Sequence, residues 1–536
     1  MTIGEKIAIL RSRLSLSQQA LADRLSVSRQ SVSKWEIDAA CPSVEKLTAL
    51  SRIFGVSLDE LLVADVDVKP AVPDVEGGNK YFGTDGFRGE ANVTLNSIQA
   101  YRVGRFLGWY LSCRTASSSK RARIVIGKDT RRSSYMLEYS IVAGITASGA
   151  DAYMLHVTTT PGVSFVTRGE EFDAGIMITA SHNPYYDNGI KIINRYGEKL
   201  DDKTTALIEA YIDGRLDALG LSADIPFATR ENIGAIFDHA AGRNRYMGYL
   251  ISLASHSYRE LKIGIDAACG SAWQLARSVF SALGARLTVI GDNPDGLNIN
   301  RGVGSTHIEA LSRLVVENHL DLGFAFDGDC DRCIAVDATG KVVDGDAIMY
   351  ILAKRLKARG NLVDNTVVAT VMSNSGLDTA LSELGIKTVR TQVGDRFVYE
   401  EIKRGDYSLG GEQSGHIIIK KYATTGDGLL TAIMVLEEMM DKKCSLKELT
   451  ERLVLYPQYS VSVRVSDKAQ AVSNPAVLAA VREVEEHIGG RGRVLLRKSG
   501  TEPVVRIMVE CPSEGGCREY AQIILNKIKE CGYGVE

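Results

Sequence analysis

Three aspartates stand at alternate positions in the segment Asp327-Gly328-Asp329-Cys330-Asp331-Arg332. Carboxylates this close repel one another unless a hard cation neutralises them. The segment begins like an EF-hand calcium loop, but Arg332 and Ala338 stand where that loop needs its glycine and its bidentate glutamate. The spacing therefore indicates a magnesium site with few protein ligands, completed by a phosphate oxygen. A solvated acidic turn is the alternative.

Ser181 follows the apolar run 174–178, which reads as a buried strand, and precedes turn signals at Asn183-Pro184 and Asp187-Asn188-Gly189. In open α/β sheets, ligands bind at the carboxyl ends of the strands. A serine at such a place is either a nucleophile or a cap for the following turn, and this stretch taken alone favours the cap.

Two further loops carry polar groups that suit a phosphorylated sugar. In the segment 497–503, two cations, two hydroxyls and amides freed by a glycine suit a phosphate dianion: Arg497, Lys498, Ser499, Gly500 and Thr501. Arg497 stands where a Walker A loop needs its second glycine, and a plain hairpin turn is the alternative. In the segment 411–416, Glu412, Ser414 and His416 offer the acceptor, hydroxyl and titratable groups that sugar hydroxyls need.

The elements that must position these loops form a unit that occurs three times between residues 123 and 416. Each unit has an apolar strand, a helix, a second strand and then a third strand that ends in a polar loop. The three polar loops are those of Ser181, Asp327 and Glu412, so they occupy equivalent positions and are expected to converge on one cleft. The segment 455–536 differs and indicates a smaller α+β domain.

Bulk composition sets limits on the class of protein. A chain of 536 residues is too long for one core, and 45% hydrophobic with 24% charged residues is typical of soluble globular domains. The net charge of −3 and the lack of a long apolar run give no global attraction to nucleic acid or membrane. Nine scattered cysteines fit a reducing cytoplasm, and the C-x-x-C of Cys330 and Cys333 lacks the second pair of a zinc site.

Residues 1–62 read as short helices, and 63–80 as a linker rich in Asp, Pro and Gly. Ser17 and Ser28 are placed to cap two helices joined by a tight turn, which is the helix-turn-helix pattern. The segment resembles the Cro/lambda-repressor family. That resemblance implies a phosphate contact at Gln18 and a recognition helix that reads duplex DNA through Arg29, Gln30, Ser33 and Lys34.

The charge of this N-terminal domain leaves a second interpretation open. Eight Lys or Arg residues stand against seven Asp or Glu, a weak electrostatic footprint for DNA binding. A single copy should therefore bind weakly, and useful binding would require a homodimer on neighbouring half-sites. The alternative is a helical module that no longer binds DNA.

The remainder of the chain resembles the α-D-phosphohexomutases. The resemblance rests on segments 179–184, 327–332, 411–416 and 497–503 in the family's order, together with 82–89 and 127–131. It implies three α/β domains and a smaller α+β domain around a central cleft: 81–255 with the phosphoserine loop, 256–345 with the metal loop, 346–454 with the sugar loop and 455–536 with the phosphate loop. Cys330 departs from the family's usual glycine.

The resemblance also implies roles for individual residues. Phosphorylated Ser181 would exchange its phosphoryl group with the sugar, with Mg²⁺ held by Ser181, Asp327, Asp329 and Asp331. Lys191 and His416 match the family's candidate acid and base, and Arg88 lies beside the phosphoserine. Substrate-binding residues would be Arg332, Glu412, Ser414, Arg497, Ser499, Gly500, Thr501 and Arg506.

The substrate predicted from the resemblance is glucosamine phosphate, interconverted between its 6- and 1-phosphates. The motifs of that branch are Gln413, Val393-Gly394-Asp395-Arg396 and 424–429. Two alternatives stay open: a mutase for glucose or mannose phosphate, and a DNA-binding regulator that senses a sugar phosphate. The intact serine and aspartates argue against the sensor, because sensing alone needs no phosphoserine.

Overall fold

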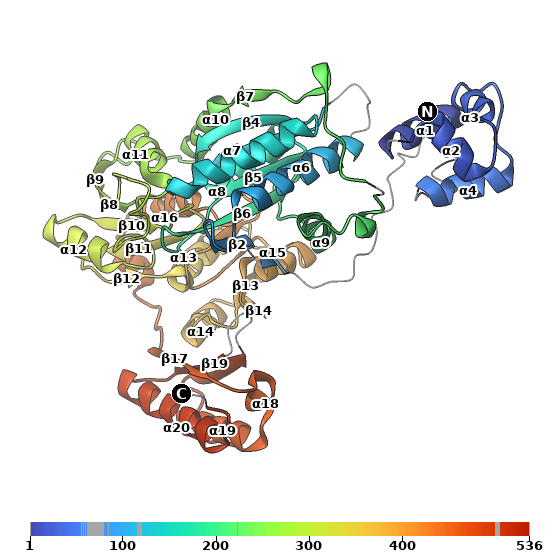
Figure 1. Ribbon diagram of the computed structural model, residues 1–536. Helices are drawn as coiled ribbons and strands as arrows, with labels where there is room; N and C mark the ends of the chain where they lie inside the picture. The colour runs from blue at the N-terminus through green and yellow to red at the C-terminus, as the bar shows by residue number, and fades with distance from the viewer. Residues whose placement is uncertain are drawn as a thin grey trace.

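The computed structural model describes residues 2–14, 16–54, 56, 58, 61, 80–83, 85–114, 121–221, 223–498 and 504–534. It contains a helical N-terminal unit, three α/β units and a small α+β unit at the C-terminus (Figure 1). The expected fold class is therefore confirmed. The linker 63–80 lies outside the described residues except for Lys80, and the predicted domain boundaries remain predictions.

Four helices lie in the described part of the N-terminal unit, packed around a small apolar core that includes Leu21, Val32 and Trp35. The Ser17 side chain accepts a hydrogen bond from the backbone N–H of Ala20, and Ser28 accepts one from Ser31, so both serines cap helices as the sequence predicts. The helices are α1 (Ile3–Arg13), α2 (Gln18–Leu25), α3 (Arg29–Glu36) and α4 (Val44–Phe54).

The first α/β unit is built on a seven-stranded sheet of order β1-β2-β6-β5-β3-β4-β7. Its strands are β1 (Phe82–Gly83), β2 (Gly86–Glu90), β3 (Arg123–Lys128), β4 (Asp151–Val157), β5 (Ala174–Ile178), β6 (Asp187–Asn194) and β7 (Ile236–Asp238). Strands β5, β3, β4 and β7 are parallel, whereas β6 and β2 join antiparallel. The helices are α6 (Ser97–Arg114), α7 (Arg132–Ala147), α8 (Thr160–Gly169), α9 (Asp202–Ile212) and the 3-10 turns η1 (Asp217–Leu219) and η2 (Arg230–Asn232).

Helices cover both faces of this sheet. Ile124 and Ile126 belong to the apolar core shared with α6 and α7, while Val125 between them belongs to the core shared with α8. Alternate residues of one strand thus enter different cores, because successive side chains point to opposite faces. Burial on both faces explains why the central strands read as continuous apolar runs.

The second and third sheets follow the same plan with fewer strands. The second, of order β12-β11-β10-β8-β9, consists of β8 (Lys262–Asp266), β9 (Arg286–Ile290), β10 (Leu322–Phe326), β11 (Cys333–Asp337) and β12 (Val342–Val343), with α10 (Ala240–Ser252), α11 (Ala272–Ala282) and α12 (Glu309–Glu317). The third, of order β14-β13-β15-β16, consists of β13 (Thr366–Thr370), β14 (Lys387–Thr391), β15 (Leu409–Gly411) and β16 (Ile417–Ile419). Its helices are α13 (Gly345–Ala358), η3 (Val363–Asn365), α14 (Ser375–Glu383), α15 (Asp395–Arg404), α16 (Gly428–Lys442) and α17 (Leu446–Thr450).

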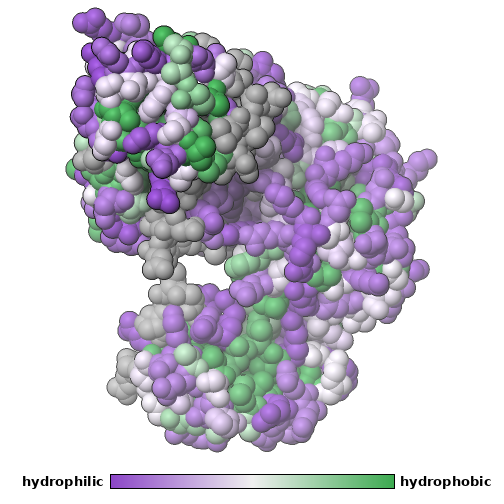
Figure 2. Space-filling model, turned by 90° about the vertical axis from the view of Figure 1, so that its right-hand side faces the viewer, coloured by the Kyte–Doolittle hydropathy of each residue, from purple (hydrophilic) through white to green (hydrophobic). Residues whose placement is uncertain are grey.

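The C-terminal unit is a three-stranded antiparallel sheet of order β17-β19-β18 with helices packed on it. The elements are β17 (Gln458–Arg464), α18 (Lys468–Ser473), α19 (Pro475–Ile488), β18 (Arg493–Lys498), β19 (Val504–Glu510) and α20 (Glu514–Glu530). Arg497 and Lys498 end strand β18, whereas the sequence placed them in the loop. In Figure 2 hydrophobic residues gather on the visible face of this lower lobe, beneath a mostly hydrophilic upper lobe.

In the described residues, no helix combines the length and the apolar character that crossing a membrane requires.

Candidate active site

The Ser181 loop begins where the fully buried strand β5 ends. Ser181 itself is 1% exposed and has a left-handed backbone, with φ of 51°. The hydroxyl of Thr179 accepts a hydrogen bond from the Ser181 N–H at 2.9 Å. Two side chains hold the Ser181 carbonyl: Asn300 donates to it at 2.8 Å and Arg131 at 3.1 Å. A left-handed backbone is unfavourable for a residue other than glycine, so it persists only where surrounding contacts hold it. These hydrogen bonds hold Ser181 in that conformation.

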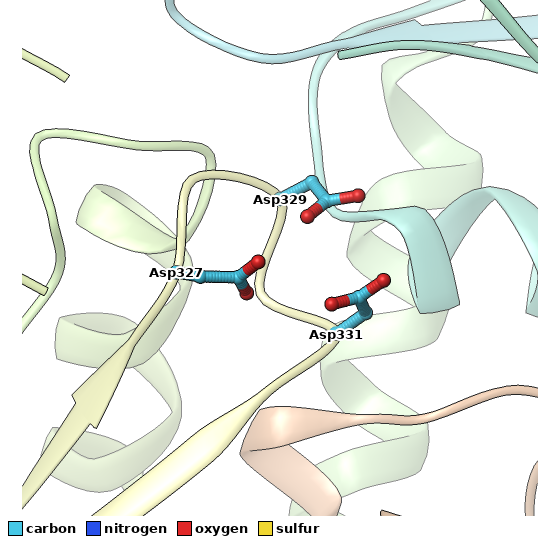
Figure 3. A group of neighbouring side chains, drawn as sticks. All are labelled: Asp327, Asp329 and Asp331. Atoms are coloured by element: carbon cyan, nitrogen blue, oxygen red, sulfur yellow. The ribbon is translucent and has the colours of Figure 1, made fainter. Parts of the chain in front are cut away.

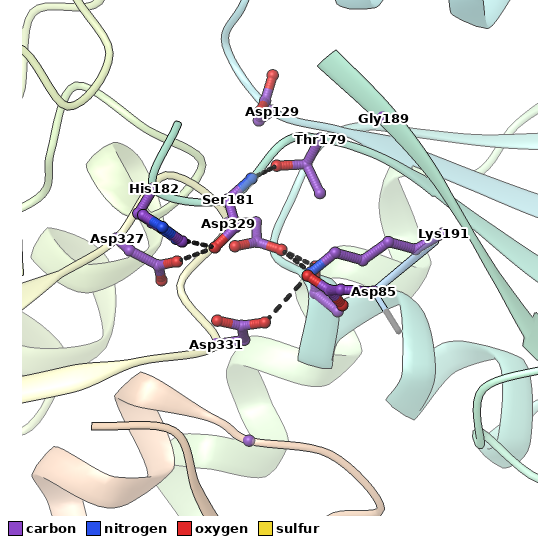
Figure 4. A network of polar contacts seen from close by, with 12 residues as sticks. Asp85, Asp129, Thr179, Ser181, His182, Gly189, Lys191, Asp327, Asp329 and Asp331 are labelled. Atoms are coloured by element: carbon purple, nitrogen blue, oxygen red, sulfur yellow. Dashed lines mark hydrogen bonds and ion pairs between the residues drawn. The ribbon is translucent and has the colours of Figure 1, made fainter. Parts of the chain in front are cut away.

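The Ser181 hydroxyl points at the metal loop of the second sheet (Figure 4). Its Oγ donates to Oδ2 of Asp327 at 2.5 Å, and Nδ1 of His182 lies 3.4 Å from the same Oγ. Burial, followed by the charges of Arg332 and Arg88, lowers the pKa of His182 to about 4, so this imidazole is neutral at pH 7. The serine thus has a carboxylate and a neutral imidazole within reach.

The three aspartates form a compact buried group in the loop between β10 and β11 (Figure 3). Each can offer a carboxylate oxygen such that the three lie within 4.8 Å of one another. Burial, followed by the charges of Asp331 and Asp329, raises the pKa of Asp327 well above its ordinary value. Oδ1 of Asp329 and Oδ1 of Asp331 are buried without a hydrogen-bond partner among the described residues. Orphaned buried carboxylate oxygens are the donor set of a hard cation, so these residues fit a divalent metal.

Lys191 lies on β6, opposite Met177 of β5, and this pairing brings it to the aspartates. Its Nζ lies 2.8 Å from Asp329, 3.2 Å from Asp331 and 3.1 Å from Asp85 (Figure 4). Burial alone would lower the pKa of Lys191, but these three carboxylates raise it well above the ordinary value. Burial alone would likewise raise the pKa of Asp331, but Lys191 and His416 hold it well below its usual range. Lys191 is therefore an ammonium here.

The sugar loop of the third sheet also reaches this cluster. Nδ1 of His416 lies 3.6 Å from Asp331, and its Nε2 lies 3.0 Å from the Gly426 backbone nitrogen, whose N–H it can accept only when the imidazole is neutral. Burial opposes protonation of His416, yet Asp331 and Asp395 raise its pKa to about 9. Glu412 accepts a hydrogen bond from the Gly394 N–H, and Ser414 is exposed.

Two guanidinium groups complete the charged surroundings. Arg88 pairs with Asp85 and donates to Asn183 at 3.4 Å, while Arg332 lies 3.9 Å from Asp331. The Nε atoms of Arg88 and Arg332 are buried and have no hydrogen-bond partner among the described residues. Unused cationic donors beside a serine suit the oxygens of a phosphate.

A cavity of about 210 Å³ opens beside Lys191 and His416, between the first and third units. Its lining includes Lys199, Asp395 and Thr424. Lys199 pairs with Asp85 at 2.7 Å and with Asp395, so it links the two units across the cavity. The three loops predicted to converge therefore do converge on one site.

The described residues of the fourth predicted loop, Arg497 and Lys498, lie at the end of strand β18 in the C-terminal unit. Contacts from the C-terminal unit go to the neighbourhood of α14: Glu510 accepts from Ser375, and Arg493 donates to the Ser373 carbonyl. Figure 1 shows this unit hanging below α14. Arg497 pairs across the strands with Arg506, and burial together with Arg506 lowers the pKa of Arg497. Ser499, Gly500 and Thr501 lie outside the described residues.

Several residues of the site were not singled out from the sequence. Asp85, Lys199 and Asp395 hold Lys191 and His416 in a shared charge network, and Asn300 holds the serine loop. Asp85 and Asp395 stand inside motifs quoted for the family, which was the available signal, whereas Asn300 and Lys199 have none. Gln413, used as a pointer to the amino sugar, donates to Asp344 at 3.3 Å and to Gln458 at 3.1 Å.

Helix α3, predicted to be the recognition helix, presents Arg29, Gln30 and Lys34 to solvent, while Ser33 is half-buried. Gln18 donates its amide to Glu36 at 2.8 Å, and Glu36 also pairs with Arg11. The side chain predicted to meet a phosphate is thus engaged within the domain.

Comparisons with known proteins agree with this architecture. Models of phosphoglucomutase/phosphomannomutase domains match residues 79–217 (domain I), 244–340 (domain II), 344–456 (domain III) and 461–527 (C-terminal domain). A helix-turn-helix model matches residues 7–61.

Curated relatives match most of the chain. The phosphoglucosamine mutase of Lachnospira eligens is 58% identical over 456 residues, which cover 85% of this chain and 100% of the relative. That of Lachnoclostridium phytofermentans is 53% identical over 85% of this chain and 99% of the relative. The remaining part of this chain lies outside both matches.

Solved structures share the fold. A phosphoglucomutase/phosphomannomutase family protein from Burkholderia thailandensis has a TM-score of 0.68 and 22% identity, covering 86% of this chain and 99% of that one. An Aspergillus fumigatus N-acetylphosphoglucosamine mutase, solved with GlcNAc-6P and magnesium, has a TM-score of 0.58 and 16% identity over 85% and 97%. The matched domain models and the full-length relatives together mean that the chain belongs to the phosphoglucomutase/phosphomannomutase family of phosphohexomutases, with a helix-turn-helix domain at its N-terminus.

Proposed function

We propose that this chain interconverts glucosamine 6-phosphate and glucosamine 1-phosphate through phosphorylated Ser181. The observation that carries the proposal is the Ser181 hydroxyl, which lies 2.5 Å from Asp327. Around it are carboxylate and guanidinium atoms that have no hydrogen-bond partner among the described residues. The choice of sugar rests on the relatives named phosphoglucosamine mutase, 58% and 53% identical over their whole length.

The reaction is two phosphoryl transfers. The free sugar hydroxyl attacks the phosphorus on Ser181; a new O–P bond forms, the serine O–P bond breaks, and the hydroxyl proton passes to a nearby base. The sugar bisphosphate then reorients in the site, and Ser181 takes the other phosphoryl group. Arg88 and Arg332 orient the phosphate oxygens, while His416 and Lys191 are the proposed proton donors and acceptors at the sugar oxygens.

Asp327, Asp329, Asp331 and Ser181 would hold a magnesium ion. When bound, the ion neutralises charge that develops on the transferred phosphoryl group. The sugar hydroxyls would meet Glu412 and Ser414. The non-reacting phosphate would meet Arg497, Ser499, Gly500, Thr501 and Arg506 once the C-terminal unit approaches the cleft.

The test is a mutase assay of the purified, phosphorylated chain on three substrates: glucosamine, glucose and mannose 6-phosphates. We expect the highest kcat/KM for glucosamine phosphate. A higher value for glucose or mannose phosphate would overturn the substrate but leave the mechanism standing. Equal turnover by Ser181→Ala would overturn the mechanism.

A second proposed function is DNA binding by α3. The observation that favours it is the exposure of Arg29, Gln30 and Lys34 on a helix capped as in helix-turn-helix domains. Gln18 would contact a phosphate only after releasing Glu36, and Ser33 would contribute at the edge of the helix. Half-site binding by a homodimer is part of this proposal.

Selection from random duplexes with the full chain tests the DNA proposal. An enriched, roughly palindromic site that is lost in the Arg29→Ala, Gln30→Ala double variant would support it. No enrichment at low salt would contradict it, whatever the mutase assay gives.

A further inference from the structure

A second cavity, of about 340 Å³, lies in the groove between α10 and α11. It shares no lining residue with the cavity beside Lys191 and His416. Its volume falls within the range of about 300–1,000 Å³ that small-molecule sites occupy. Figure 1 shows the two helices at the same edge of the α/β body.

The groove carries donors suited to an anion. Arg243 and Arg277 line it, with Asp292 as the one acidic residue of the lining. Arg243 makes one long hydrogen bond, 3.5 Å to the Val157 carbonyl. Arg277 pairs with Asp292 through one of its nitrogens, and a guanidinium has five N–H donors. Two cations against one carboxylate leave a net positive lining that can take up a phosphate.

Ser271 adds a second, independent observation. It is 2% exposed, lines the groove and stands at the N-cap of α11, yet its Oγ makes no hydrogen bond to any described residue. The first turn of α11 contains no acidic residue to offset the positive end of the helix dipole. A buried hydroxyl left unsatisfied costs free energy, and a ligand oxygen in the groove would satisfy it.

The groove also has an apolar side. Trp273, Met247 and Leu275 line it, and Trp273 is half-buried. Indole beside guanidinium groups suits a flat ring attached to a phosphate, because the ring can stack while the phosphate meets the arginines. Asn244 and Gln274 add polar groups at the margin.

This groove lies directly behind the metal loop. The Ser271 N–H donates to the Gly328 carbonyl at 2.8 Å, and Gly328 stands between Asp327 and Asp329. A Cβ added to Gly270 would lie 2.5 Å from the same carbonyl oxygen. The backbone at Gly270 and Ser271, which leads into α11, is therefore in tight contact with the metal loop. A ligand held by Ser271 would therefore restrain the loop that carries the aspartates.

We propose that the groove between α10 and α11 binds a small phosphate ester with a flat ring, of which a nucleoside monophosphate is the simplest case. Its phosphate meets Arg243, Arg277 and the Ser271 hydroxyl, and its ring stacks on Trp273. Occupancy tightens metal binding at the Asp327 loop. The binding step is independent of the mutase function.

Binding is tested by titrating the full chain with adenosine 5′-monophosphate and following tryptophan fluorescence, which only Trp35, Trp109 and Trp273 can contribute. We expect saturable quenching that is lost in Trp273→Phe. Calorimetry should show affinity at least about tenfold weaker in Arg243→Gln, the loss of a charged hydrogen bond. The matched control is Arg245→Gln, on the same helix but paired with Glu170, which should bind normally.

Each other outcome counts against the proposal. No saturable binding to the wild type at millimolar nucleotide, or equal affinity in Arg243→Gln, would overturn the site. If adenosine binds as tightly as the nucleotide, the phosphate contributes nothing to binding. If inorganic phosphate binds as tightly, the ring contributes nothing. Either result contradicts the proposal.

The coupling is tested by calorimetric titration of magnesium with and without the nucleotide. We expect magnesium affinity about fivefold or more higher when the groove is occupied. At a nucleotide concentration that fills the wild-type groove but leaves that of Arg243→Gln mostly empty, the variant should show a much smaller gain, which also controls for chelation by the nucleotide. Unchanged magnesium affinity in the wild type would overturn the coupling. Neither readout needs mutase activity, so failure here is distinct from failure of the proposed reaction.

Discussion

The Ser181 cluster and the exposed face of α3 contain similar residue types in opposite environments. Lys191 and Asp331 are 4% and 3% exposed and are held by partners from different units of the chain. Arg29 and Lys34 extend into solvent from a helix that is complete without them. Burying charges is costly unless they are paired or serve a ligand, whereas exposed charges cost almost nothing.

This difference decides how much each region says about function. One buried oxygen each of Asp329 and Asp331 has no hydrogen-bond partner among the residues that the structure describes, so the cluster itself argues for a cation and a phosphate. The face of α3 is compatible with DNA binding and equally with an idle surface. The burial of unsatisfied charged groups is itself evidence for a ligand, whereas a ligand for an exposed surface must be shown by a binding experiment.

The sharpest test of the buried region is Ser181→Ala. We expect kcat to fall by about 10⁴–10⁶-fold, because the proposed reaction needs the Ser181 hydroxyl to donate and then accept a phosphoryl group on either side of the reorientation of the bisphosphate. Intact mass should show one phosphate on the wild type and none on the variant. Ser140→Ala on α7, whose hydroxyl donates to the Met136 carbonyl of its own helix, is the control. Wild-type turnover by Ser181→Ala would break the comparison.

Charge removal at the metal loop should have the next largest effect. Asp329→Asn keeps the shape but removes a negative charge, so we expect kcat to fall by about 10²–10³-fold and magnesium affinity to fall with it. Chelation of the wild type should abolish activity, and added magnesium should restore it. Glu317→Gln on the surface helix α12 controls for charge alone. An Asp329→Asn enzyme that remains fully active in chelator would contradict the metal assignment.

Arg497 and Arg506 of the C-terminal unit are half-buried, between the buried charges of the Ser181 cluster and the exposed charges of α3. Arg497→Gln or Arg506→Gln should each remove about 1.5–3 kcal/mol of interaction with the non-reacting phosphate, raising KM about 10- to 100-fold. The effect should be smaller on kcat, because this phosphate does not react. Arg491→Gln, exposed just before β18, should leave KM unchanged. A normal KM in both strand variants would show that this unit does not clamp the substrate.

Changes on α3 should separate the two regions completely. Arg29→Ala should weaken duplex binding by about 1–3 kcal/mol, the range for a specific base contact, with mutase kinetics unchanged. Electrophoretic shift of a selected duplex and the mutase assay measure the two effects on one preparation. Unchanged DNA affinity would leave α3 as a surface without this role, and a loss of mutase activity would show that the regions are coupled.

The smallest expected effect is that of Cys330→Gly. Cys330 has a left-handed backbone, with φ of 60°, which glycine adopts without strain. It stands between Asp329 and Asp331 in the sequence, and its buried side chain belongs to the apolar core. We expect kcat within about twofold of the wild type. Cys330→Val is the opposing variant, because a branched side chain is strongly disfavoured at this φ, and it should reduce metal affinity. Equal metal affinity in the valine variant would show that the loop tolerates strain.

Local patterns in the sequence were sufficient to predict several strands and helices and the loops that form the buried Ser181 cluster. The apolar run 174–178 marked β5, because a strand buried on both faces leaves no polar alternation to obscure it. Cap residues marked α2 and α3, since the capping bond is made within four residues. The end of β18 was misplaced, because cross-strand pairing with β19 continues the strand through Lys498.

Contacts between distant segments could not be read from the sequence. Asn300, Lys199 and Asp395 belong to the site because folding brings them to Ser181, Asp85 and His416, far along the chain. The groove between α10 and α11 exists only because these two helices, which are separated along the chain, pack side by side. Sequence alone determined which residue types and local turns were available. Tertiary structure decided which charges were buried together, since burial and pairing depend on contacts that no local pattern encodes.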